Sequence, residues 1–299
     1  MYQDKHKAEL LKLIMNAGSR YDVWRVFSDF CEMLADTISN SVDWPQRKEH
    51  EAGYRKLIGQ YDKDTQKLFP QMAAELTAAL QRCAENGSYQ DILGQTFHEL
   101  GVQNEWKGQF FTPQSVSDLM AEMSFGSLAD FDRRVKEQGY VDVYEPACGA
   151  GSTILGFLNA YRKFKPDGGF GEFVVHAGDV DARCVHMCYI QLSLYGVAAI
   201  AEQRNALSME LAGGIWYTPM YIINGWEWRE LRGKHKAEKK ELPQDLPQLP
   251  QELPQQKENP PETEGEVEMS LFLVDVFDEE ETNVCNEKKK PSSRRCSRG

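Results

Sequence analysis

The chain has no apolar run of roughly 18 or more residues, the length that a membrane-spanning helix requires. Its first residues are charged and lack the apolar stretch of a secretory signal. The seven cysteines are an odd number at scattered positions, which does not fit a disulfide framework and is typical of free thiols in a reducing compartment. We therefore expect a cytoplasmic protein with no membrane partner.

The sequence is also short of positive charge. Lysine and arginine number 34 against 46 acidic residues, which gives a net charge of −12. A protein that binds nucleic acid unaided usually carries a basic surface. Any DNA affinity must then come from a partner or from a local basic face, such as the run between Arg229 and Lys240 or the tail after Lys288. Charge runs of this kind are more often solvated surface.

Two patterns divide the rest of the chain. Apolar residues at helical spacing predict a helical N-terminal region over residues 1–105, with helices between 5 and 101. From about residue 113, helices alternate with strands, which predicts an α/β domain with a parallel, doubly wound sheet over 106–240. The strands are expected at 140–144, at 173–178, within 197–207 and at 220–224.

The C-terminal part changes composition. Repeated Leu-Pro-Gln units predict an extended linker over residues 241–265, because proline at this density blocks helix and sheet. Residues 266–299 are acidic and then basic, and we expect a disordered tail. A short apolar stretch at 269–277 is the one strand-like segment there.

The most specific motif follows the first expected strand. It reads Glu145-Pro146-Ala147-Cys148-Gly149-Ala150-Gly151 and leads into an expected helix. Glycines at the carboxyl edge of a parallel sheet let the backbone approach a ligand closely. The third glycine of the dinucleotide fingerprint is absent. A lone Gly-x-Gly would favour an ordinary strand-turn-helix joint, but the full string is much more specific.

Two further elements accompany the turn. Gly108-Gln109-Phe110-Phe111-Thr112-Pro113 precedes it, and Asp179 ends the next expected strand. A carboxylate at that strand end can accept hydrogen bonds from both hydroxyls of a ribose. Phe110 and Phe111 could equally anchor the core, and Thr112 could cap the helix that Pro113 opens. Asp181 is more typical of a helix N-cap.

These residues, in this order, resemble the S-adenosylmethionine (SAM) site of the N-6 adenine DNA methylases, in particular the modification subunits of type I restriction systems with the gamma-type motif order. The resemblance extends over about residues 89 to 210. It implies a SAM-dependent methyltransferase Rossmann-like fold, double-stranded DNA as substrate, a separate specificity subunit, and a bacterial, phage or mobile-element origin.

The resemblance also implies residue roles. SAM would lie over Gly149 and Gly151, with Glu145 at its ammonium group and Asp179 at its ribose. Asn205 occupies the place of a family aspartate that contacts the adenine of SAM, although a plain turn residue is an equal alternative. The expected cofactor residues are Phe110, Thr112, Pro113, Glu145, Pro146, Ala147, Gly149, Gly151, Asp179 and Asn205.

The fourth family motif is incomplete. The family carries Asn or Asp, then Pro-Pro and Tyr or Phe, after the fourth strand, where an amide and a backbone carbonyl accept the hydrogens of the adenine amino group and the aromatic ring stacks on the flipped base. The corresponding residues here are Asn224-Gly225-Trp226. Asn224 is the expected catalytic contact, with Trp226 or Trp228 stacking. Asn259-Pro260-Pro261 lies in the linker and is interpreted as coincidence.

Several alternatives remain open. The lost prolines, the short sheet and the acidic charge also fit an inactive SAM-binding relative that acts as an interaction subunit. A methyltransferase for RNA or protein is a weaker possibility. Cys184, His186 and Cys188 lie within one expected helix, but zinc needs four ligands and the chain offers no second cluster at finger spacing. We therefore expect these three residues to pack in the core, and no metal.

Overall fold

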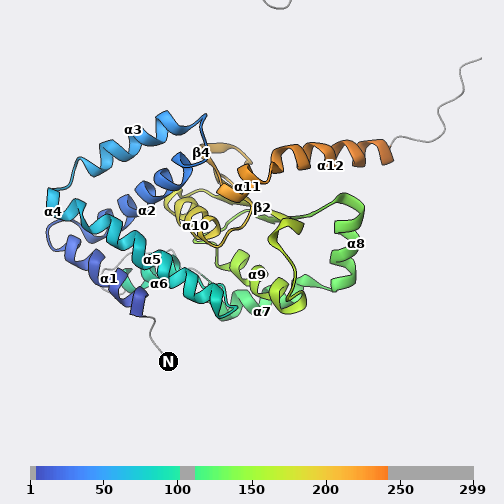
Figure 1. The fold of residues 1–299 in the computed structure, drawn as a ribbon, viewed down its shortest axis with the longest axis horizontal. Helices are drawn as coiled ribbons and strands as arrows, with labels where there is room; N and C mark the ends of the chain where they lie inside the picture. The colour runs from blue at the N-terminus through green and yellow to red at the C-terminus, as the bar shows by residue number, and fades with distance from the viewer. Residues whose placement is uncertain (1–4, 102–111, 242–299) are drawn as a thin grey trace, which may run out of the picture. The chain divides into compact units, whose positions relative to one another are not determined.

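The computed structural model describes residues 5–101 and 112–241. The N-terminal region forms six helices within these limits (Figure 1), as its apolar spacing predicts. They are α1 (Lys5–Gly18), α2 (Val23–Asn40), α3 (Arg47–Ile58), α4 (Lys63–Gln66), α5 (Leu68–Glu85) and α6 (Ile92–Gly101). No helix in the described ranges is long and apolar enough to cross a membrane.

The second part is built on a sheet with the strand order β1-β2-β3-β4. The strands are β1 (Val141–Glu145), β2 (Phe173–Asp179), β3 (Ala199–Arg204) and β4 (Leu211–Tyr217). The first three run parallel, with Val141 opposite Phe173 and Val175 opposite Ala199. The fold is therefore α/β, as expected.

The connections between the parallel strands are helical. They are α9 (Ser152–Phe164), followed by the short 3-10 helix η1 (Phe170–Glu172), and α10 (Ala182–Leu194). Before the sheet come α7 (Gln114–Phe125) and α8 (Leu128–Gln138), and after it come α11 (Pro219–Ile223) and α12 (Trp226–Glu241). Apolar side chains of α9, α10, the N-terminal helices and one face of the sheet join in one large core.

The expected strand at 220–224 is wrong. These residues lie in and just after α11, which begins with Pro219 in its first turn, where proline's fixed φ suits a helix. The fourth strand is β4 instead, and it pairs antiparallel with β3. Its two central glycines, Gly213 and Gly214, weaken the strand signal in the sequence. The sheet is therefore not parallel throughout.

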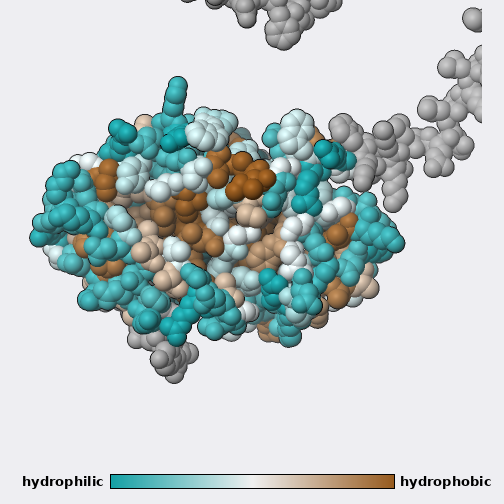
Figure 2. Space-filling model, in the orientation of Figure 1, coloured by the Kyte–Doolittle hydropathy of each residue, from teal (hydrophilic) through white to brown (hydrophobic). Residues whose placement is uncertain are grey.

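A second, smaller core lies on the other side of the sheet. It consists of Tyr140, Val174, Ala198, Tyr221 and Trp226. Tyr140, Val174 and Ala198 lie just before or near the start of the three parallel strands, so α11 and the start of α12 cover the amino-end half of this face. The surface over α11 is apolar (Figure 2), and Ile223 there is 66 % exposed.

Candidate cofactor-binding site

The glycine-rich turn leaves β1 at Glu145 and enters α9 at Ser152. Its two glycines have positive φ, +53° at Gly149 and +102° at Gly151, which side chains rarely tolerate. The amide of Cys148 donates to the carbonyl of Gly178 on β2 at 2.8 Å. A Cβ at Gly151 would lie 3.2 Å from the Sγ of Cys188 on α10. The backbone is therefore held tightly on the protein side of the turn.

Asp179 ties this turn to the end of β2. Its Oδ2 accepts the Gly149 amide at 2.9 Å, and its Oδ1 accepts the Asp181 amide at 2.9 Å. A carboxylate oxygen has two lone pairs, so each oxygen can accept one more hydrogen bond. Asp181 itself caps α10 by accepting the Arg183 amide, as the sequence predicts. The structure thus brings Gly149 and Asp179 together at the carboxyl edge of the sheet.

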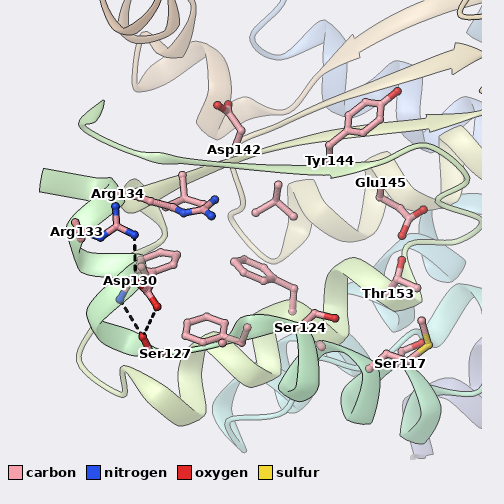
Figure 3. A pocket seen from close by; sticks show the side chains of 18 residues that line it. Ser117, Ser124, Ser127, Asp130, Arg133, Arg134, Asp142, Tyr144, Glu145 and Thr153 are labelled. Atoms are coloured by element: carbon pink, nitrogen blue, oxygen red, sulfur yellow. Dashed lines mark hydrogen bonds and ion pairs between the residues drawn. The ribbon is translucent and has the colours of Figure 1, made fainter. Parts of the chain in front are cut away.

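Glu145 stands where this turn meets a cavity of about 680 Å³. The cavity lies between β1, α7 and α8, with Glu145, Thr153 and Ser117 at one end and Arg133 and Arg134 at the other (Figure 3). Its volume is within the range of small-molecule sites. The two turn glycines and the β2 carboxylate do not line it, so turn and cavity adjoin at Glu145 alone.

Thr112 and Pro113 lead into α7, and α7 contacts the helix that follows the glycine-rich turn. Pro113 is the N-cap of α7 and no side chain caps it, so the alternative role of Thr112 as a helix cap is wrong. Ser117 on α7 donates its hydroxyl to Ser152 Oγ, at the start of α9, at 3.3 Å. The two helices approach closely because Gly156 has no Cβ; one there would lie 2.6 Å from the Ser117 carbonyl oxygen. Phe110 lies outside the described residues.

A buried polar network supports the turn from behind, and sequence reasoning missed it. Gln191 on α10 is fully buried, and its amide donates to the Ala150 carbonyl at 2.8 Å and to Asp91 Oδ1 at 2.9 Å. Its own oxygen accepts the Leu93 amide at 3.2 Å. Burial raises the pKa of Asp91. The sequence signal was a glutamine within a mostly apolar helix. This signal is weak, because a glutamine there could equally face solvent.

Asn205 acts as a turn residue, the alternative role that the sequence analysis left open for it. Its side-chain oxygen accepts the amides of Leu207 at 2.9 Å and Ser208 at 3.2 Å. These bonds form the turn between β3 and β4 and use both lone pairs of the oxygen. Both lone pairs of the oxygen are thus engaged within the turn in this conformation, and its contact with the adenine of SAM stays a prediction.

The expected catalytic residues lie at the other end of the sheet. Asn224 follows α11, and the preceding Thr218 hydroxyl donates to the Val197 carbonyl at 2.8 Å, just before β3 begins. Asn224 lies at this end because β4 runs antiparallel, so the carboxyl end of β4 is at the amino edge of the parallel strands. Five residues of β1, at about 3.3 Å each, put the two edges roughly 15 Å apart.

Trp226 is also unsuited to stacking on a base. It is fully buried and packs edge-to-face on Tyr140 with ring centroids 5.4 Å apart. Trp228 is 66 % exposed but belongs to the same helix start, at the amino edge. Arg229, the first residue of the basic run, stacks on Trp226 and donates to the Gly171 carbonyl at 2.8 Å, so protein contacts already hold its guanidinium.

The three residues considered for metal binding on α10 pack in the core, as expected. Cys184, His186 and Cys188 are all buried. Burial raises the pKa of the Cys184 thiol and lowers that of His186 to about 4. The thiol is therefore protonated and the imidazole neutral at pH 7, and both side chains act as core residues.

Comparison with known proteins gives one family-model match and two similar proteins. Residues 89–221 match the family model described as N-6 DNA Methylase. The methylase subunit of the type I restriction enzyme MpnII from Mycoplasma pneumoniae is 29 % identical over 99 residues, which are 32 % of this chain and 16 % of that protein. A type I restriction-modification methyltransferase subunit from Streptococcus thermophilus aligns with 18 % identity and a TM-score of 0.30, covering 64 % of this chain and 56 % of that one. The predicted resemblance to the N-6 DNA methylases is thus confirmed over residues 89–221. The chain spans only a small part of the length of the curated relative.

Proposed function

From the N-6 DNA methylase character of residues 89–221, we propose that this chain binds SAM and transfers its methyl group to the exocyclic amino group of adenine in DNA, in a restriction-modification or mobile-element setting. The observation that carries the proposal is the pairing of Asp179 with the Gly149 amide at 2.9 Å. It places a carboxylate and a glycine-rich turn together at the carboxyl edge of β1 and β2, where open α/β sheets bind nucleotides.

The residues at this edge fit SAM in charge and in shape. The free lone pairs of Asp179 suit the two ribose hydroxyls, and Gly149 has no side chain to cover the backbone where the ligand would lie. Glu145 keeps one carboxylate oxygen beyond the Oε1 that accepts the Ala147 amide, and this oxygen would meet the SAM ammonium group. When bound, SAM supplies an electrophilic methyl group on its sulfonium.

The backbone of the turn at Pro146 and Ala147 would flank the ligand. One side of the SAM site would be closed by Thr112 and Pro113, at the start of α7. Phe110 keeps its expected role there as part of the proposal. The acidic chain would depend on a separate specificity subunit for sequence readout and for much of its affinity for DNA.

One observation favours a second candidate, a SAM-binding subunit that does not itself catalyse transfer. Within 112–241, the structure brings no Asn-Pro-Pro-aromatic motif to the carboxyl edge, and Asn224 lies at the opposite edge. An adenine amino group would then lack the acceptors that hold it for in-line attack. In that case the chain would deliver SAM binding or contacts to a larger assembly.

Transfer of labelled methyl from SAM to unmethylated bacterial DNA distinguishes the two. The full chain is assayed alone and in lysate of its host, and the DNA is digested to nucleosides. Label in N6-methyladenine supports the enzyme. Specific SAM binding without label in either setting supports the non-catalytic subunit. A chain that folds and does not bind SAM contradicts both.

A further inference from the structure

Three potential metal ligands converge on the sheet face opposite α9 and α10. Asp142 comes from β1, His176 from β2 and Glu230 from α12. His176 Nε2 lies 2.8 Å from Glu230 Oε1 and 3.7 Å from Asp142 Oδ1, and the three ligand atoms all lie within 4.8 Å of one another. It is the one such group found among the residues that the structure describes.

The remaining oxygen of each carboxylate already has a partner. Tyr221 donates its hydroxyl to Glu230 Oε2 at 2.8 Å. Gln138 donates its amide to Asp142 Oδ2 at 3.1 Å. These bonds turn Oε1 and Oδ1 toward His176. Outer hydrogen bonds that orient the ligands in this way are a regular feature of protein metal sites.

We propose that Asp142, His176 and Glu230 bind one divalent transition-metal ion, with Zn²⁺ the best fit. One imidazole nitrogen and two carboxylate oxygens suit zinc, whereas Mg²⁺ and Ca²⁺ prefer oxygen alone. Zinc bonds of about 2.0 Å in tetrahedral geometry place neighbouring ligand atoms about 3.3 Å apart. The observed 2.8 and 3.7 Å lie on either side of this value, so small side-chain rotations suffice.

The ion can reach the site from solvent. The side chains of Asp142 and His176 are 46 % and 32 % exposed, while that of Glu230 is 13 % exposed. Figure 3 shows Asp142 projecting from β1 on the side away from α7. Three protein ligands leave a fourth position for water. The ion would join α12 to two strands of the sheet and so stabilise the start of this helix against the second, smaller core.

Without metal the group forms an ion pair. The contacts with Asp142 and Glu230 raise the pKa of His176 to about 9, so the imidazole is protonated at pH 7 and zinc must displace that proton. The closed ion pair is the competing account, and it predicts no specific metal binding. SAM plays no part in either account, so the result is independent of the proposed function.

The test is calorimetric titration of Zn²⁺ into the full chain, with the purification tag removed and the thiols reduced. We expect one site with a dissociation constant below about 10 µM at neutral pH, and no heat with Mg²⁺. His176→Gln and Glu230→Gln should each weaken binding at least about tenfold. His6→Gln is the matched control and should leave binding unchanged, because it breaks another histidine–carboxylate pair, the 2.8 Å contact of His6 on α1 with Glu75 on α5.

A visible spectrum of the Co²⁺-loaded chain separates this site from the cysteines. Nitrogen and oxygen ligands give no thiolate-to-metal charge-transfer band. Circular dichroism establishes that each variant is folded. Absence of binding in the folded wild-type chain overturns the proposal, as does binding that survives in both His176→Gln and Glu230→Gln or that shows the thiolate band.

Discussion

Replacing Gly151 by alanine tests whether the turn is built for close backbone approach. Gly139, which ends α8, is a matched control because its backbone is nearly the same: φ +97° and ψ −12°, against φ +102° and ψ +11° at Gly151. Alanine at positive φ costs roughly 1–2 kcal/mol. The added Cβ has nothing within 4 Å at Gly139, so Gly139→Ala should lose about that amount.

Gly151→Ala carries a second cost. Its Cβ would lie 3.2 Å from the Sγ of Cys188, which is fully buried and cannot move freely. Overpacking of this kind costs about 1–3 kcal/mol, so the total loss should be roughly 2–5 kcal/mol. Because the turn must shift to relieve the contact, SAM affinity should also fall by about tenfold or more, equivalent to about 1.4 kcal/mol.

Urea unfolding followed by circular dichroism measures the first quantity, and calorimetric titration with SAM measures the second. Gly139→Ala should keep wild-type SAM affinity. Cys188→Ala in the Gly151→Ala background should recover part of both losses, as a double-mutant cycle detects. Equal stability losses in the two glycine variants, or wild-type SAM affinity in Gly151→Ala, would refute the reasoning.

Three other outcomes follow from the same contacts. Asn224→Ala should leave SAM affinity and any methyl transfer unchanged, because the residue lies at the amino edge; loss of transfer with intact SAM binding would restore its catalytic assignment. Gln191→Leu should lower the free energy of unfolding by about 3 kcal/mol or more, because it takes the Gln191 partner from the buried Leu93 amide and Ala150 carbonyl, at about 1–3 kcal/mol each, and removes one hydrogen bond from Asp91. Gln81→Leu on an exposed face should change the free energy of unfolding by less than about 0.5 kcal/mol in urea unfolding. Burial, and to a lesser extent the nearby His50, lowers the pKa of His186 from 6.5 in the unfolded chain to about 4, so the contribution of the neutral imidazole to stability is complete above pH 6.5 and is lost as the pH falls toward 4. The wild type should therefore lose about 3 kcal/mol of unfolding free energy between pH 7 and pH 4, and His186→Leu should not show this loss.

Local pattern was enough to predict the helical region, the parallel strands and the turn. The string from Glu145 to Gly151 carries its own geometry, since only glycine tolerates the backbone there, and Asp179 follows at the end of the next strand. These are short-range features, in which neighbouring residues determine the conformation. The hydrogen bond between Gly149 and Asp179 was not itself predicted, but both residues were expected at the same site.

The direction of the fourth strand was not predictable in the same way. The sequence of residues 211–217 does not determine whether this strand pairs parallel or antiparallel with β3. The apolar run at 220–223 fits a strand as well as a buried helix. That error moved Asn224 to the wrong edge. The Gln191 network and the convergence of Asp142, His176 and Glu230 depend on residues far apart in the chain, which a single sequence does not bring together.

The central claim is that SAM binds at the Gly149–Asp179 edge, and calorimetric titration of SAM into three forms of the full chain tests it most directly. Asp179→Asn replaces one carboxylate oxygen by an NH₂ group, which faces the backbone N–H of Gly149 or of Asp181 and cannot accept its hydrogen bond. Asp181→Asn is the control, because asparagine caps a helix as well as aspartate does and so preserves the cap of α10. The account predicts one SAM site in the wild type, unchanged affinity in Asp181→Asn and at least about a tenfold loss in folded Asp179→Asn. Equal affinity in all three forms, or no binding to the wild type, would contradict it.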